Sequence, residues 1–251
     1  MGLLGLTWLA MGAAAGCLLV VTVTGVRRPD RPPPDQAGYL REWSALHGGY
    51  DPSASAVTGR WLALVRAVAR PLASRGVAPG AVTCWGLWAA AAVAAGAAGP
   101  GRWPLLGVPA VVASGLLDSL DGAVAVLSGR ASRFGYLLDS LADRCADSGY
   151  VLALFLAGAP GWLCLAGGGL AAAQEYVRAR AGNAGMGEIG VVSVWERPGR
   201  VLVTAFALLG AGAFPAVAGT AAAAGAAAWV ALGTVGCGQV LRAAHTALLP
   251  H

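Results

Sequence analysis

The chain has 251 residues, of which 57% are hydrophobic, and it carries a formal net charge of +5. This composition excludes a soluble domain built around one large core and indicates a polytopic membrane protein. All 17 basic residues are arginines dispersed between apolar segments, which favours anionic lipid head groups over nucleic acid as partners.

The first apolar run, Leu3 to Val26, predicts a retained transmembrane helix, because about 20 apolar residues suffice to cross a bilayer. The run is followed at once by Arg27, Arg28 and Arg31. By the positive-inside rule, these residues predict that the C-terminal end of the helix is cytoplasmic. Residues 32–34 are prolines and form a stiff spacer. We therefore expect residues 1–35 to be an N-terminal transmembrane helix with a proline-rich spacer.

Residues 36–76 are the most polar part of the chain and predict an amphipathic helix in the membrane interface. Apolar residues alternate here with arginines, for example Trp61, Leu64 and Val68 with Arg60, Arg66 and Arg70. Such a helix would lie with its arginines toward lipid phosphates. An ordinary cytosolic linker helix is the alternative.

Six further apolar segments predict a helical core within residues 77–251, and their many Ala and Gly residues suit close packing in lipid. They cover residues 81–99, 103–120, 134–158, 161–179, 200–215 and 219–241. If the first helix ends in the cytoplasm, Arg102 alone falls in an outer loop, as the positive-inside rule requires. The expected fold is all-α: a polytopic bundle of six core helices, one N-terminal transmembrane helix and an interfacial helix.

Four aspartates, Asp118, Asp121, Asp139 and Asp143, lie close together at the junction of two apolar segments. Their spacings of three and four residues place each pair on one helical face. Two helices meeting at a turn would bring the four carboxylates to one point, where their repulsion favours a bound cation. Hard oxygen ligands suit Mg²⁺ or Mn²⁺, and two such ions can polarise a phosphate.

Two other interpretations of the aspartates remain open at this point. They could line a cation pathway, although a transporter would need polar residues deeper in its helices. They could also form helix caps and salt bridges to nearby arginines, namely Arg130, Arg133 and Arg144.

The pattern Asp-x2-Asp-Gly-x2-Ala-x9-Gly-x3-Asp-x3-Asp, from Asp118 to Asp143, resembles the signature of the CDP-alcohol phosphatidyltransferase family. Val126 stands where that signature has Arg. The resemblance implies an enzyme of phospholipid biosynthesis that transfers a phosphatidyl or related group from CDP-diacylglycerol, or a similar CDP-linked lipid, to an alcohol and releases CMP. A non-catalytic lipid-binding homologue is the alternative, because Val126 cannot supply the charge of Arg.

The resemblance also implies roles for individual residues. The four aspartates would hold two Mg²⁺ or Mn²⁺ ions against the CDP diphosphate, and Asp143 would be the catalytic base that deprotonates the acceptor hydroxyl. Contacts to the nucleotide are implied for Gly122, Ala125 and Gly135, and for Pro79 and Thr83, which resemble the family's Pro-Asn-x-Val-Thr entry. A plain helix N-terminus is the alternative for the last two residues.

Three pairs of arginines could either bind phosphate groups or anchor the chain on the cytosolic side. Arg130 and Arg133 could replace the charge missing at Val126, or could anchor a cytosolic turn. The pairs Arg178/Arg180 and Arg197/Arg200 lie in segments resembling those of family members with a phosphorylated acceptor, and Arg suits bidentate phosphate recognition. We therefore expect an alcohol phosphate as acceptor, with positive-inside anchoring as the alternative.

The family resemblance and the arginine distribution also predict where the protein lies and how it assembles. We expect an integral protein of the cell membrane with its active site facing the cytoplasm, and the resemblance implies a homodimer.

Overall fold

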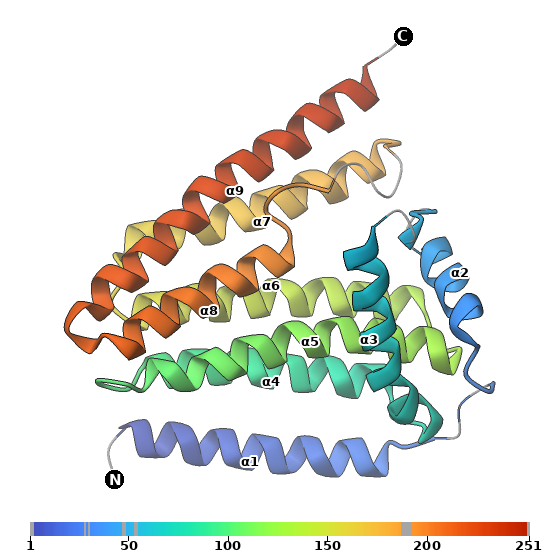
Figure 1. The fold of residues 1–251 in the computed structure, drawn as a ribbon, viewed down its shortest axis with the longest axis horizontal. Helices are drawn as coiled ribbons and strands as arrows, with labels where there is room; N and C mark the ends of the chain where they lie inside the picture. The colour runs from blue at the N-terminus through green and yellow to red at the C-terminus, as the bar shows by residue number, and fades with distance from the viewer. Residues whose placement is uncertain are drawn as a thin grey trace. The chain divides into compact units, whose positions relative to one another are not determined.

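The computed structural model describes residues 3–27, 29, 31–46, 49–52, 55–186 and 192–249; Arg28, expected beside the membrane, lies outside this part. Within these residues the fold is all-α and contains no strand, which confirms the expected fold class. Figure 1 shows the helices in chain order. Their bounds are α1 Leu3–Thr24, α2 Gln36–Leu46, α3 Ala56–Ser74, α4 Pro79–Ala97, α5 Pro104–Ser128, α6 Arg133–Leu156, α7 Gly161–Asn183, α8 Arg197–Ala213, the short 3-10 helix η2 Pro215–Val217, and α9 Ala218–Leu248.

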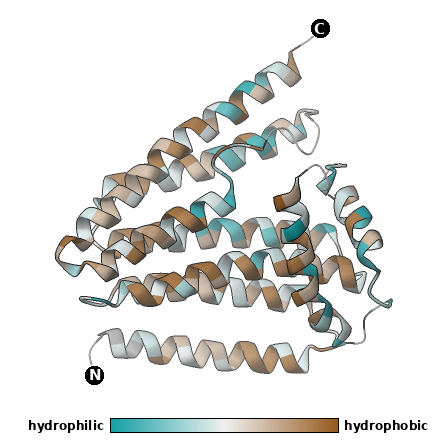
Figure 2. Ribbon diagram, in the orientation of Figure 1, coloured by the Kyte–Doolittle hydropathy of each residue, from teal (hydrophilic) through white to brown (hydrophobic). Residues whose placement is uncertain are grey.

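Four stretches of the described helices are long and apolar enough to cross a membrane: Thr7–Thr24, Pro79–Ala97, Pro104–Ser128 and Pro215–Leu248. Figure 2 shows α1 mostly in brown and near-white, whereas the C-terminal part of α7 is more hydrophilic. The other expected core segments, α6, α7 and α8, form helices at their predicted places. Compared with the four apolar stretches, α6 carries several charged residues, and α8 is shorter, with 17 residues.

The chain divides into two compact units. The aspartate unit comprises Leu9–Trp88 and Leu116–Asp143, and the arginine unit comprises Met1–Trp8, Ala89–Gly115 and Arg144–His251. Each unit has a hydrophobic core of its own.

In the aspartate unit, α2 and α3 pack against the second half of α5. Tyr39 of α2, Val65 of α3 and Leu127 of α5 are buried in one cluster. A second apolar stripe of α3 stays exposed, formed by Val57, Trp61, Leu64 and Val68. An amphipathic helix in the membrane interface needs such a stripe, and the interfacial position of α3 stays a prediction.

Helix α1 is joined to α4 by two tryptophan side chains. Trp85 Nε1 donates to Thr22 Oγ1 at 3.0 Å, and Trp88 Nε1 donates to the Met11 carbonyl at 2.9 Å. Indole N–H groups in an apolar setting need an acceptor, so these bonds fix how α1 lies along α4.

The arginine unit is held together by close packing of α7, α8 and α9. Trp195 and Trp229 are fully buried and meet edge to face, with ring centroids 5.2 Å apart. A Cβ at Gly167 would lie 2.8 Å from Trp229 Cβ, and one at Gly225 would lie 2.4 Å from Ala207 Cβ. Glycines at these positions allow the helices to approach each other, as the Ala- and Gly-rich sequence predicts.

Candidate active site

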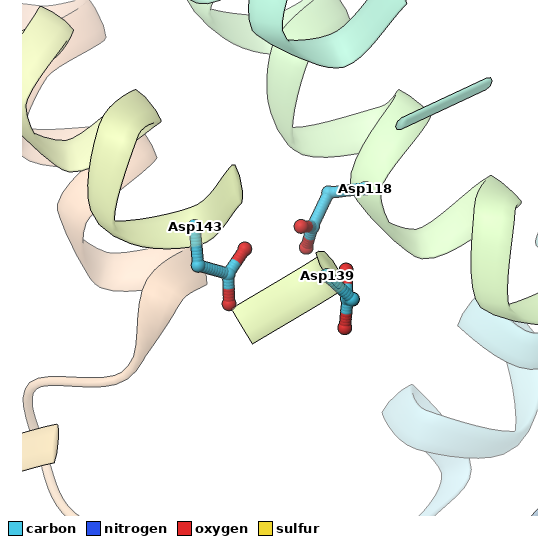
Figure 3. Close-up of side chains that lie close together, drawn as sticks. All are labelled: Asp118, Asp139 and Asp143. Carbon is cyan, nitrogen blue, oxygen red and sulfur yellow. The ribbon is translucent and has the colours of Figure 1, made fainter. Parts of the chain in front are cut away.

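Three of the four predicted aspartates converge in the aspartate unit. Asp118 lies on α5, and Asp139 and Asp143 lie one turn apart on α6. One carboxylate oxygen from each lies within 4.8 Å of the other two, and Figure 3 shows the three side chains facing a common space. All three are partly exposed, which leaves access for an ion. Carboxylate oxygens so arranged fit a hard divalent cation such as Mg²⁺ or Mn²⁺.

The fourth aspartate, Asp121, is buried and held by the protein itself. Thr83 Oγ1 of α4 donates to Asp121 Oδ2 at 2.7 Å, and the Gly122 N–H donates to Asp121 Oδ1 at 2.6 Å. A carboxylate oxygen has more than one lone pair, so these bonds orient Asp121 without using all its capacity as a ligand. A contact between Thr83 and the nucleotide stays a prediction. The hydrogen bond from Thr83 to Asp121 was not expected from the sequence.

The two glycines of the predicted nucleotide site differ in their surroundings. A Cβ built on Gly122 meets nothing within 4 Å, so the face of α5 beside the aspartates is open. A Cβ on Gly135, near the start of α6, would lie 3.1 Å from Ser132 Oγ. Ser132 Oγ also accepts from the Gly135 N–H at 3.0 Å. Gly122 therefore has the space that a ligand requires, whereas Gly135 belongs to the start of its helix.

Arg130 is engaged with the backbone of the N-terminal segment. Its Nη1 donates to the Gly76 carbonyl at 3.3 Å and its Nη2 donates to the Arg27 carbonyl at 2.8 Å. Gly76 has φ +77°, and the Arg27 N–H donates to its carbonyl at 3.1 Å. These contacts support the anchoring interpretation of Arg130. Its predicted nucleotide contact, like that of the exposed Arg133, stays a prediction.

A different arginine approaches Val126, the position where the sequence pattern lacks one. Arg31 Nη2 donates to the Val126 carbonyl at 3.0 Å and also pairs with Glu42 of α2. The sequence indicates only a membrane-flanking position for Arg31, because nothing in the spacing links this residue to α5.

The predicted acceptor arginines lie in the arginine unit, and two of them are bound by carboxylates. Arg200 is fully buried; its Nη1 lies 2.8 Å from Asp147 Oδ2 and its Nη2 lies 3.1 Å from Glu175 Oε1. Arg178 pairs with Glu175 at 3.1 Å and with Glu196 at 2.7 Å. Both arginines therefore share their charge with acidic residues of the chain.

Glu196, the residue before α8, is a partly buried member of this network of charges. Burial would raise its pKa, but hydrogen bonds from Arg178 and from the Ser193 N–H and hydroxyl outweigh burial and lower the pKa below its ordinary value. Glu196 is thus ionised at neutral pH. Of the two remaining predicted arginines, Arg180 is exposed and Arg197 is half-buried.

The sequence model of the family described as CDP-alcohol phosphatidyltransferase matches residues 77–235, which is more than half of the chain. The chain belongs to the CDP-alcohol phosphatidyltransferase family. The matched residues contain all four aspartates of the candidate site and both predicted arginine pairs, whereas α1, α2 and α3 precede the match.

Curated relatives of the chain are named archaetidylinositol phosphate synthase or phosphatidylinositol phosphate synthase. The chain is 36% identical over 97 residues to the archaetidylinositol phosphate synthase of Pyrococcus horikoshii, covering 37% of this chain and 50% of that protein. It thus spans about half the length of that relative. It is 32% identical over 161 residues to the phosphatidylinositol phosphate synthase of Mycobacteroides abscessus, covering 59% of this chain and 70% of the relative.

Solved structures of a phosphatidylinositol phosphate synthase have a similar fold. The phosphatidylinositol phosphate synthase of Mycobacterium tuberculosis with CDP-DAG bound aligns with a TM-score of 0.57 and 27% identity, over 72% of this chain and 94% of that one. The same enzyme in complex with manganese and citrate aligns with a TM-score of 0.56 and 26% identity, over 72% and 89%.

Asp147 is a further charged residue of the site that the sequence motif does not include. It is buried one helical turn beyond Asp143 on α6, and besides Arg200 it lies 3.4 Å from Arg144 Nη2. The signal was present, because Asp139, Asp143 and Asp147 repeat at intervals of four residues on one helix.

Proposed function

We propose that this protein transfers a phosphatidyl group from a CDP-linked lipid, such as CDP-diacylglycerol, to an alcohol phosphate and releases CMP. The observation that carries the proposal is the convergence of Asp118, Asp139 and Asp143 in a chain of the CDP-alcohol phosphatidyltransferase family. The CDP-DAG complex of the tuberculosis enzyme supports the choice of donor.

We propose that the four aspartates hold two Mg²⁺ or Mn²⁺ ions. When bound, such ions would neutralise the diphosphate of the donor and stabilise the charge that develops on the leaving CMP. The carboxylate cluster and the manganese complex of the tuberculosis enzyme support this part of the proposal. Asp121 would contribute from a buried position, with Thr83 holding its carboxylate in place.

In this scheme Asp143 accepts the proton of the acceptor hydroxyl, so that the hydroxyl oxygen can attack the phosphorus. Gly122 would let the nucleotide approach α5, since a side chain there would fill space that is now open. Ala125 would extend this surface, and Pro79, Gly135, Arg130 and Arg133 remain proposed as further nucleotide contacts.

We propose an alcohol phosphate, in the first place inositol phosphate, as the acceptor. The names of the relatives and the four arginines Arg178, Arg180, Arg197 and Arg200 support this choice. Arg180 and Arg197 would contact the phosphate directly. Arg178 and Arg200, which are already paired with carboxylates, would position the segment that carries them.

The protein would be integral to the cell membrane, with the aspartates facing the cytoplasm. The apolar helices α1, α4, α5 and α9 support the membrane location. The arginine distribution supports the orientation, because only Arg102 would then lie outside. A homodimer stays a prediction.

The test is release of CMP by purified protein from CDP-diacylglycerol with Mg²⁺ or Mn²⁺ and a panel of acceptors. The panel pairs inositol phosphate with inositol, and glycerol phosphate with glycerol, and adds serine. We expect CMP release with a phosphorylated acceptor only, and none after the divalent cation is chelated.

Two results would contradict the proposal. Transfer to inositol or serine, without use of the phosphorylated acceptors, would show that the acceptor class is wrong. No CMP release with any acceptor would favour the non-catalytic lipid-binding alternative, to which Val126 points.

A further inference from the structure

A cavity of about 410 Å³ opens in the aspartate unit where α2 approaches the end of α5. Its lining consists of two charged and six small or apolar residues: Arg31, Glu42, Ala45, Leu46, Ala125, Val126, Gly129 and Ala131. This volume falls within the range of sites for small ligands, about 300–1,000 Å³. Arg31 and Glu42 precede the residues that match the family, so the N-terminal segment supplies all the charge of the cavity.

The cavity continues one face of α5 from the aspartates. Asp118, Gly122, Ala125 and Gly129 follow at intervals of four, three and four residues and therefore share a helical face. Asp118 and Ala125 are seven residues apart, or about 10 Å along the helix axis. Gly122, between them, leaves this face open. A nucleoside attached to a diphosphate at the aspartates has the length to reach the cavity.

The position of Arg31 depends on local features of α5. A Cβ on Gly129, whose φ is +72°, would lie 3.2 Å from Arg31 Nε and 3.3 Å from its Cγ. The Arg31 stem therefore lies against the bare backbone of Gly129. Its guanidinium donates to the Val126 carbonyl at 3.0 Å and pairs with Glu42.

The charge of the cavity indicates which part of a nucleotide it suits. Arg31 and Glu42 neutralise each other, so a phosphate would gain little there. Together they offer hydrogen-bond donors next to an acceptor, between walls of small apolar residues that admit a flat ring. Cytosine presents the complementary edge, an exocyclic amino donor beside ring acceptors, and carboxylates accept hydrogen bonds from that amino group.

We propose that Arg31 and Glu42 select the pyrimidine base of the donor: Glu42 accepts from the cytosine amino group, and Arg31 donates to the adjacent acceptors. The inference rests on the proposed function, since it presumes a cytidine diphosphate donor. Uracil carries a carbonyl in place of the amino group, which Glu42 disfavours. The N-terminal segment thus gives base specificity to a site whose other residues come from the family's core.

The experiment measures how strongly CMP and UMP inhibit CMP release from radiolabelled CDP-diacylglycerol by the full chain with Mn²⁺. In the wild type we expect CMP to inhibit at least about 10-fold more strongly than UMP. Glu42→Gln and Arg31→Lys should each reduce this ratio toward one, because a matched base contact accounts for discrimination of this order. Asp51→Asn removes an exposed carboxylate outside the cavity and should keep the wild-type ratio.

The ratio separates base selection from a merely structural role. If the pair only attaches α2 to α5, the variants lower activity with an unchanged CMP-to-UMP ratio, and the inference is wrong. If the cavity binds a phosphate, Glu42→Gln strengthens inhibition by both nucleotides equally, which also overturns the inference. A half-exposed ion pair contributes little to stability, so the variants are expected to fold.

Failure of the proposed function is distinguished by a second measurement. If the wild type releases no CMP at all, nucleotide binding is measured instead. The readout is the rise in unfolding temperature of the purified protein with Mn²⁺ and either CDP or UDP. A preference for CDP that Glu42→Gln abolishes supports the base contact without catalysis. Equal shifts with both nucleotides overturn it.

Discussion

Thr83 Oγ1 donates a hydrogen bond of 2.7 Å to Asp121 Oδ2, and both side chains are buried. The bond joins α4 to α5 and orients Asp121, the aspartate of the motif outside the group of three whose carboxylate oxygens lie within 4.8 Å of one another. A residue that holds a metal ligand in place affects the metal indirectly, through the direction of the ligand's lone pairs.

Replacing Thr83 by Val should therefore raise the Mn²⁺ concentration that half-maximal CMP release requires. Loss of a hydrogen bond to a metal ligand costs roughly 10–100-fold in metal affinity or activity. The measurement is a Mn²⁺ titration of the initial rate at saturating donor. Thr83→Ser keeps the hydroxyl and is the matched control. If the Thr83→Val and Thr83→Ser variants need the same Mn²⁺ concentration, the bond does not affect metal binding.

Asp118→Asn, Asp139→Asn and Asp143→Asn should each lower CMP release by more than the roughly 100-fold expected for an indirect partner, because each removes a carboxylate proposed to bind the ions directly. Initial rates with Mg²⁺ and Mn²⁺ test this expectation. Asp51→Asn makes the same change at an exposed position outside the cluster and should leave the rate unchanged. Near-normal turnover of Asp139→Asn would exclude the two-ion assignment.

Replacing Arg200 by Ala should destabilise the protein rather than specifically weaken acceptor binding. Arg200 is only 1% exposed and pairs with Asp147, which is also buried. Removing one partner leaves a buried charge without compensation, at a cost of about 3–5 kcal/mol. Thermal unfolding in detergent measures the effect, and Arg180→Ala is the exposed control, expected within about 0.5 kcal/mol of the wild type. Equal unfolding temperatures of the two variants would contradict the structural role.

Replacing Arg180 or Arg197 by Ala should raise the KM for inositol phosphate about 10-fold, since a lost phosphate contact of ~1.4 kcal/mol is a factor of ten. The KM for CDP-diacylglycerol should stay unchanged, because the proposed donor contacts lie on other residues. Steady-state kinetics with each substrate varied in turn checks both expectations. Arg102→Ala is the matched control, and an unchanged acceptor KM in both test variants would assign these arginines to topology alone.

The sequence by itself determined the helical architecture and the aspartate cluster. Long apolar runs predict helices because a bilayer offers the backbone no other hydrogen-bond partners, and all six core segments appear at their expected places. The convergence of Asp118 with Asp139 and Asp143 follows from helical spacing and a short turn, both of which are local properties of the chain.

Only the tertiary structure decided which charged groups meet. Arg178 and Arg200 lie in segments that resemble those of phosphate-binding family members, yet Arg178 pairs with Glu196 beyond its own helix. Arg200 pairs with Asp147 and Glu175 from two other helices. Arg31 reaches Val126 across 95 residues of sequence, and no periodicity predicts that contact. Helical spacing fixes neighbours within a helix, whereas partners between helices depend on how their faces pack, which a single sequence does not specify.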